Sequence, residues 1–126
     1  MVTKVLCEEV TDMTTYEELV DMVRKVFENA DARRVLEHVA IQVNVTGEGE
    51  GIFYVEIAER QVCVEPYDYF DRDCLLIMSS QTVKDLCEKK YSLRESIESG
   101  LVQFHGDKRK MYLCLDKVKP RWGRKN

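Results

Sequence analysis

The residues of this chain that could do chemistry are scattered, and their spacing fits no local catalytic motif. Neighbouring acids such as Asp71 and Asp73 could act as a general acid and base, but surface acids are far more often simply solvated. The stretch GEGEG at 47–51 interleaves glycine with glutamate, which would repel a phosphate group. His105 has no candidate nucleophile beside it. We therefore expect no catalytic residue and no enzymatic activity.

Metal ligands and reactive thiols are not indicated either. The chain has five cysteines and two histidines, with no CxxC pair, whereas a zinc site needs clustered ligands. We expect no metal site and no cofactor. The apolar stretches around Cys63, Cys74 and Cys114 predict buried free thiols, as in a protein of a reducing compartment. Cys87 lies among helical apolar positions and is expected to be buried too.

Charge and hydropathy restrict the partners and the location. The net charge of −4 argues against nucleic-acid binding. Residues 1–106 hold 11 basic and 21 acidic residues, whereas residues 107–126 hold 8 basic and 2 acidic ones. This basic end could make transient contact with an anionic membrane surface through residues 108–125, or it could neutralise the acidic body. No apolar run approaches the roughly 18 residues of a membrane span, and no signal peptide is indicated, so we expect a cytoplasmic protein.

Two amphipathic helices are predicted near the start of the chain. Thr14 or Thr15, followed three residues later by Glu17 or Glu18, forms a capping box before apolar residues at helical spacing. A second helix is expected to begin at Asp31, a good N-cap residue. Its apolar face would consist of Ala32, Val35, Leu36 and Val39.

The hydrophobic period then changes from 3.6 to 2, which is typical of strands buried on one face. Strands are predicted over 40–46, 52–58 and 61–65, and the short turn at Glu59 and Arg60 favours an antiparallel meander. Residues 67–73 form a polar and aromatic connection. The apolar run at 74–78 predicts a central strand covered on both faces.

The last third alternates between helices and short strands. Ser79 or Ser80 caps one helix, Ser92 opens another, and Gly100 ends it. Residues 101–105 predict a strand, and residues 108–119 fit either a strand or a helix. This order favours a single α+β domain over 1–126, with a largely antiparallel sheet covered on one face by helices and a tail at 119–126.

The predicted sheet and helices carry more apolar side chains than so small a domain requires. These residues either pack against one another or line a ligand cavity. On the sheet they are Phe53, Val55, Ile57, Leu76, Met78 and Phe104, and on the helices they are Leu86, Ile97, Met111 and Leu115.

The second half of the chain resembles the sterol carrier protein type 2 family of sterol- and lipid-binding domains. The resemblance rests on an Asp-Cys strand at 73–78, a serine-capped helix, and the segment GLVQFHG at 100–106. Strands and loops at 41–65 match the opening hairpins of that family, so the resemblance spans about 36–118. It implies a five-stranded sheet and helices around a hydrophobic tunnel. It also implies that residues 108–119 form a helix, with Met111 and Leu115 facing the ligand.

Two functions follow from this resemblance. The first is non-enzymatic binding of a fatty acid, a fatty acyl-CoA or a sterol-like lipid in the tunnel, for sequestration or transfer. The ten apolar residues named above would form the tunnel lining. The alternative is a protein-interaction or assembly module of the same fold that has no physiological lipid ligand.

Overall fold

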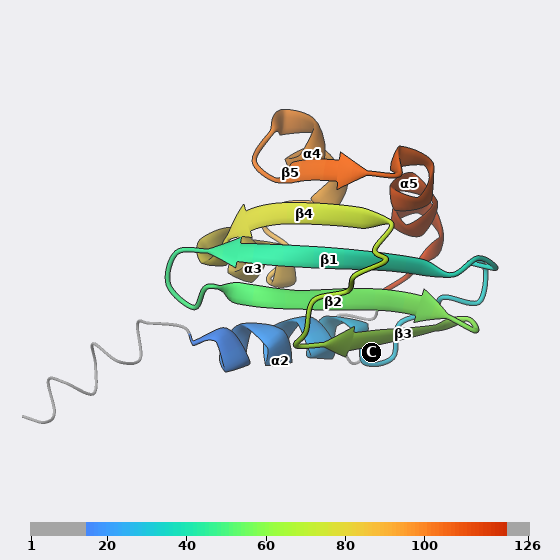
Figure 1. The fold of residues 1–126 in the computed structure, drawn as a ribbon, viewed down its shortest axis with the longest axis horizontal. Coiled ribbons are helices and arrows are strands. Elements are labelled where there is room, and N and C mark those ends of the chain that lie inside the picture. The colour runs from blue at the N-terminus through green and yellow to red at the C-terminus, as the bar shows by residue number, and fades with distance from the viewer. Residues whose placement is uncertain (1–14, 121–126) are drawn as a thin grey trace, which may run out of the picture.

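The computed structural model describes residues 15–120. This part of the chain holds four helices and five strands (Figure 1). In chain order they are α2 (Tyr16–Phe27), β1 (Val39–Thr46), β2 (Gly51–Ala58), β3 (Gln61–Glu65), β4 (Cys74–Ser79), α3 (Ser80–Cys87), α4 (Leu93–Ser99), β5 (Gln103–Gly106) and α5 (Lys108–Lys117). No helix among these is long and apolar enough to cross a membrane.

The strands form a single sheet in the order β3-β2-β1-β4-β5. The predicted meander is confirmed, because β2 pairs antiparallel with both β1 and β3. β4 pairs parallel with β1 and antiparallel with β5, so the sheet is mixed but mostly antiparallel. In this register Val43 lies beside Phe53 on one side and Leu76 on the other.

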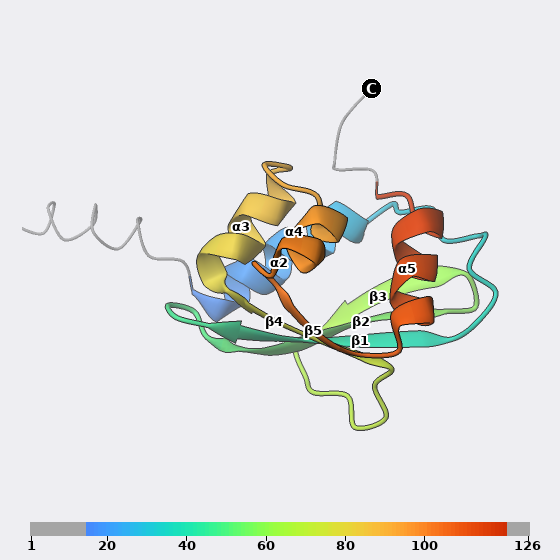
Figure 2. The ribbon, with the colours of Figure 1, turned by 90° about the horizontal axis from the view of Figure 1, so that it is seen from above.

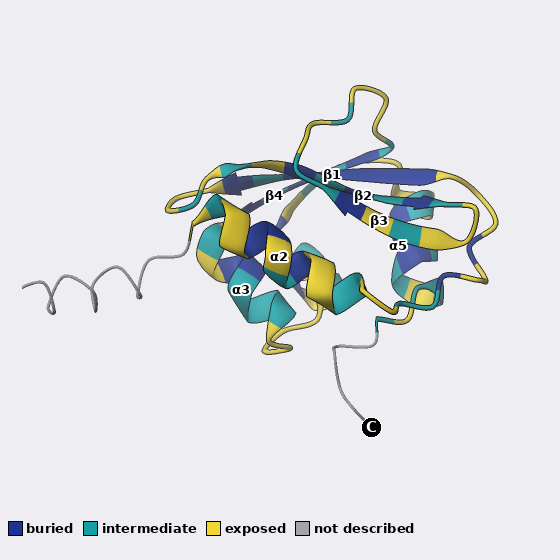
Figure 3. Ribbon diagram, turned by 90° about the horizontal axis from the view of Figure 1, so that it is seen from below, coloured by how far each residue is buried: buried dark blue, intermediate teal, exposed yellow. Residues whose placement is uncertain are grey.

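All four helices cover one face of the sheet, and the loop at 66–73 projects from the opposite face (Figure 2). The alternation of the strands explains these two faces, since successive side chains point to opposite sides. On β1 the valines at 39, 43 and 45 face the helices and are buried. Figure 3 shows buried residues running along the strands and exposed residues on the outer side of α2. One hydrophobic core therefore extends from Leu19 to Cys114.

The helix boundaries lie where the sequence predicts them. Thr15 and Glu18 form a complete capping box at α2. The hydroxyls of Ser79 and Ser92 accept backbone N–H groups at the starts of α3 and α4. Gly100 ends α4 with a left-handed φ of 88°, which glycine adopts without steric cost.

The helix predicted to begin at Asp31 does not form. Asp31 instead accepts a hydrogen bond from the Arg33 backbone N–H at 3.0 Å and pairs with Lys119 in an isolated bridge. Leu36, expected on the apolar face, is 75% exposed, and Val39 already belongs to β1. The apolar residues from Ala32 to Val39 have helical spacing, but they lie in a turn and at the first position of a strand. The spacing alone therefore predicted a helix wrongly.

Three further expectations change. The strand at 74–78 is not the central one, since β1 occupies the middle of the sheet, and Leu75 and Ile77 are only half-buried. Cys63 is exposed on β3 and Cys87 is only half-buried, although Cys74 and Cys114 are buried as expected. The predicted tail begins later than 119, because Lys119 is tied to the rest of the chain by backbone hydrogen bonds; residues 121–126 lie outside the described part.

The segment that fitted either a strand or a helix is the helix α5. Asp107 is its N-cap, and the Asp107 carboxylate accepts the Lys110 backbone N–H at 3.1 Å. Met111 and Cys114 lie on its buried side. The acidic cap offsets the unfavourable position of three basic residues at the positive end of a helix.

Candidate functional site

The ten apolar residues expected to line a tunnel all lie in one cluster between the sheet and the helices. Six belong to the buried core, namely Phe53, Val55, Ile57, Leu76, Met78 and Met111. Four are half-buried and pack against that core, namely Leu86, Ile97, Phe104 and Leu115. The structure therefore joins them in one apolar layer, and their role as a ligand lining stays a prediction.

A hollow of about 570 Å³ opens from this layer to solvent between α4, β5 and α5. Its apolar wall consists of Ile97, Val102 and Phe104, and Val102 is also part of the buried core. Its remaining lining residues are Glu98, Gly100, Gln103, His105, Lys108 and Tyr112. Ile97 and Phe104 belong to the predicted lining. The polar residues were missed because three separate elements bring them together.

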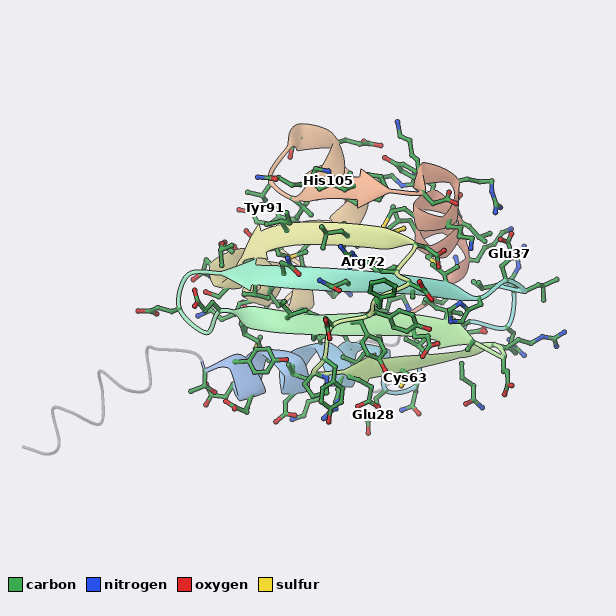
Figure 4. The ribbon with its side chains drawn as sticks, viewed as in Figure 1. Glu28, Glu37, Cys63, Arg72, Tyr91 and His105 are labelled. Atoms are coloured by element: carbon green, nitrogen blue, oxygen red, sulfur yellow. The ribbon has the colours of Figure 1, made fainter. Side chains whose placement is uncertain are left out.

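A second hollow, of about 500 Å³, shares Gly100 with the first. Its lining residues are Tyr91, Glu95, Ser96, Ser99, Gly100 and Leu101. Tyr91 and His105 mark these two hollows on the β5 side of the molecule (Figure 4). Tyr91 and Leu101 are about half exposed, so this part of the surface combines apolar contact area with solvent access.

Arg94 joins the two helices that border the first hollow. Its guanidinium forms an ion pair with the Asp116 carboxylate of α5. The same guanidinium lies over the Tyr112 ring, 4.9 Å from the ring centre, which is a favourable cation–π distance. The Tyr112 hydroxyl donates a hydrogen bond to Glu98 of α4 at 3.4 Å. Side chains of α4 and α5 therefore hold the two helices together at this side.

The three basic residues at the start of α5 have different environments. Arg109 donates two hydrogen bonds to the Glu37 carboxylate, at 2.9 and 2.8 Å, and this contact holds the pKa of Glu37 below its ordinary value. Lys110 donates to Asp73 at 3.0 Å, which raises the pKa of Lys110. Lys108 is exposed at the hollow and makes no ion pair with any residue of 15–120.

The comparison with protein families decides where this chain belongs. The model of the SCP-2 sterol transfer family matches residues 20–112. The chain belongs to this family. No curated protein sequence matches it significantly.

Solved structures show the same SCP-2 fold. Sterol carrier protein 2-like 2 from Aedes aegypti has a TM-score of 0.58 at 12% identity, over 79% of this chain and 93% of that one. A palmitated form of that protein has a TM-score of 0.55 at 14% identity, over 75% and 91%. The sec-alkylsulfatase Pisa1 from Pseudomonas sp. has a TM-score of 0.60 at 11% identity, over 75% of this chain. The matched region spans only 15% of the sulfatase chain.

The thiols of this SCP-2 domain are poor nucleophiles where they are buried. Burial raises the pKa of Cys74 and Cys87 to about 11 and that of Cys114 to about 12. At neutral pH these groups are thiols rather than the reactive thiolates. Among residues 15–120, no three His, Cys, Asp or Glu side chains are grouped as metal ligands. The described site can therefore make mainly apolar contacts, and charged residues lie at its rim.

The outer face of the SCP-2 sheet carries a polar network that sequence patterns did not reveal. The Tyr69 hydroxyl donates to Glu56 at 3.0 Å, and His38 lies 2.6 Å from the same carboxylate. Arg72 lies over β1 (Figure 4) and donates to the Gln42 side-chain oxygen at 3.5 Å. These contacts fasten the loop at 66–73 to the face opposite the apolar layer.

Proposed function

We propose that this SCP-2 domain binds an elongated hydrophobic ligand between its sheet and its helices, without acting on it as an enzyme. The ligand is a fatty acid, a fatty acyl-CoA or a sterol-like lipid, which the domain sequesters or transfers. The observation that carries this proposal is the single apolar layer in which ten residues of the sheet and helices lie together. The palmitated relative of the same fold supports it.

The physical basis of binding is the removal of apolar ligand surface from water. At about 25 cal/mol per Å², burying a few hundred Å² contributes several kcal/mol before ordering costs. The ligand would enter beside the half-buried residues Ile97 and Phe104, since these lie at the hollow. Met111, on the buried side of α5, offers the adaptable side chain that a variable ligand needs.

Transfer of a lipid also requires contact with the membrane that supplies or receives it. Within residues 108–125, Lys108 and Lys119 are basic side chains that the structure describes as exposed. They are candidates for transient contact with anionic lipid headgroups. Arg109 is exposed too, but it is already paired with Glu37. We place this activity in the cytoplasm.

Lipid binding is tested by comparing two substitutions of the same kind on opposite faces of the sheet. Phe104 packs against the apolar core at the hollow, whereas Phe70 is 91% exposed on the outer loop. We expect delipidated wild-type protein to take up palmitate in native mass spectrometry. Phe104→Ala should weaken uptake about tenfold or more, because the apolar contact of a half-buried aromatic ring is lost.

Phe70→Ala is the control and should bind palmitate as the wild type does, since its ring lies in solvent. Circular dichroism must show that both variants keep the native fold. If purified wild-type protein carries no lipid and also takes up neither palmitate nor a sterol, the lipid-binding proposal is wrong.

A second candidate is an assembly module of the same fold. Two observations favour it: six of the ten apolar residues are already buried against one another, and the fold forms only 15% of the sulfatase chain. This function predicts a stable oligomer or complex with no lipid bound. Sedimentation of the delipidated protein, together with the uptake measurement, separates the two candidates.

A further inference from the structure

We propose that the ligand is anionic at one end and that its head group lies in the hollow between α4, β5 and α5, with Lys108 as the counter-ion. This inference rests on the proposed lipid binding and narrows it. An alkyl carboxylate or an alkyl phosphate ester would form an ion pair with Lys108, whereas a neutral sterol would not.

The wall of the hollow suits an alkyl chain. Ile97 and Phe104 are half-buried and pack against the core, and Val102 is only 1% exposed. The apolar residues of the hollow therefore contact the layer between the sheet and the helices. A chain that passes between α4 and α5 would meet apolar side chains from the entrance inward.

The charge at the rim indicates which head group the hollow favours. Lys108 is exposed there and makes no ion pair within residues 15–120. The next two basic residues already form ion pairs within the chain, Arg109 with Glu37 and Lys110 with Asp73. Of the three basic residues that begin α5, Lys108 alone can therefore pair with a ligand.

The acidic groups nearby each accept a hydrogen bond from another group of the chain. Glu98 at the rim accepts the Tyr112 hydroxyl at 3.4 Å. The Asp107 carboxylate accepts the Lys110 backbone N–H at 3.1 Å as the N-cap of α5. His105 lines the hollow, but its register opposite Leu75 places it on the outer face of β5. We therefore assign the head-group contact to Lys108 rather than to His105.

The test compares an anionic ligand with a neutral one of the same chain length. Binding of dodecanoate and of dodecan-1-ol is measured by displacement of a neutral fluorescent probe from delipidated protein. Lys108→Gln should weaken dodecanoate binding by about three- to tenfold, as expected for a partly exposed ion pair, and leave dodecanol binding unchanged within about twofold. Raising the salt concentration should likewise reduce the preference of the wild type for dodecanoate over dodecanol.

Lys25→Gln is the matched control, because it removes the same charge from the exposed side of α2. It should leave both affinities unchanged, and Lys108→Arg should largely restore dodecanoate binding. Dodecyl phosphate in place of dodecanoate shows whether the head group is a phosphate ester or a carboxylate.

The outcomes distinguish the two proposals. If dodecanoate and dodecanol both bind and Lys108→Gln changes neither affinity, the head-group assignment is wrong while lipid binding stands. If the variant weakens the binding of both ligands equally, Lys108 acts on the fold and the assignment is again wrong. If neither ligand, nor palmitate, nor a sterol binds the wild type, the proposed function itself fails.

Discussion

Asp73 joins three segments that are distant in the sequence. Its carboxylate accepts the Ala40 backbone N–H of β1 at 2.8 Å and the Lys110 ammonium of α5 at 3.0 Å. Its own backbone N–H donates to the Ala40 carbonyl, and its carbonyl accepts the Asp107 N–H. Burial would raise the pKa of Asp73, but the hydrogen bonds from Ala40 and Lys110 outweigh it and lower that pKa.

This lowered pKa gives a testable pH dependence of stability. The folded-state pKa of Asp73 lies below the unfolded value of about 3.9, so the carboxylate contributes its full stability above that pH. The contribution is lost as the pH falls through the folded-state pKa. Asp73→Asn should lower the free energy of unfolding by about 1–2 kcal/mol at pH 7, and this difference should shrink below pH ~4.

Urea unfolding between pH 7 and pH 3 measures both effects. Asp71→Asn, at an exposed position of the same loop, is the control and should change stability little at any pH. A difference between wild type and Asp73→Asn that persists unchanged to pH 3 would contradict the assigned role of the carboxylate.

Among the secondary-structure elements, β5 depends on the glycine at its end, Gly106. Gly106 has a φ of 122° and lies so close to β4 that an added Cβ would sit 2.9 Å from the Cys74 Cα. Gly100 also has a positive φ, of 88°, yet nothing lies within 4 Å of its Cβ position. β5 and the start of α5 thus keep their places only if residue 106 has no side chain.

Gly106→Ala should therefore lower the free energy of unfolding by about 2–4 kcal/mol, because backbone strain and a backbone clash add together. Gly100→Ala should lower the free energy of unfolding by only about 1 kcal/mol, since the positive φ strains the backbone but an added Cβ meets no other atom. Chemical denaturation gives both values. Equal losses of unfolding free energy in the two variants would mean that the close contact of Gly106 with β4 does not contribute to stability.

Elements with a local signal were predictable from the sequence, and those that depend on distant partners were not. The cap at Ser92 and the stop at Gly100 could be identified because both act within one turn. α5 was ambiguous because Met111 and Leu115 fit both periods, and only the family resemblance favoured the helix. Residues 31–38 imitated a helix because a turn adjoins a strand.

The candidate site shows the same division. Its apolar residues could be predicted from periodicity, because each faces the core from its own element. Its charged residues could not, since Lys110 and Asp73 are 37 positions apart and Arg109 and Glu37 are 72 apart. No local pattern distinguishes Lys108, which is exposed at the hollow, from its two paired neighbours.

Considered as a whole, the molecule has its first hollow, the proposed ligand entrance, at the edge of the sheet rather than over its centre. α2 packs over the meander, while α4 and α5 cover the β5 side, where the first hollow opens (Figures 1 and 2). Movement of α4 relative to α5 would thus admit a ligand without disturbing β1 and β2. Arg94, which contacts Asp116 and Tyr112, opposes that movement.

Arg94→Ala should consequently accelerate ligand exchange. Loss of an exposed ion pair and a cation–π contact should raise the association and dissociation rates of dodecanoate together, by about three- to tenfold, and leave the affinity within about twofold. Stopped-flow fluorescence measures both rates. Arg33→Ala, which removes a local ion pair with Asp31, is the control. A change in affinity without a change in rates would contradict the gating role of Arg94.

The parallel pairing of β1 with β4 has a consequence for how the chain acquires its structure. The meander of β1, β2 and β3 closes through short turns, whereas β1 meets β4 only at a sequence separation of 33 positions, as between Ile41 and Cys74. Contacts between distant residues form more slowly because closing a long loop costs entropy. During synthesis, therefore, the meander can assemble first. The apolar layer between the sheet and the helices is completed only when α5 has emerged from the ribosome.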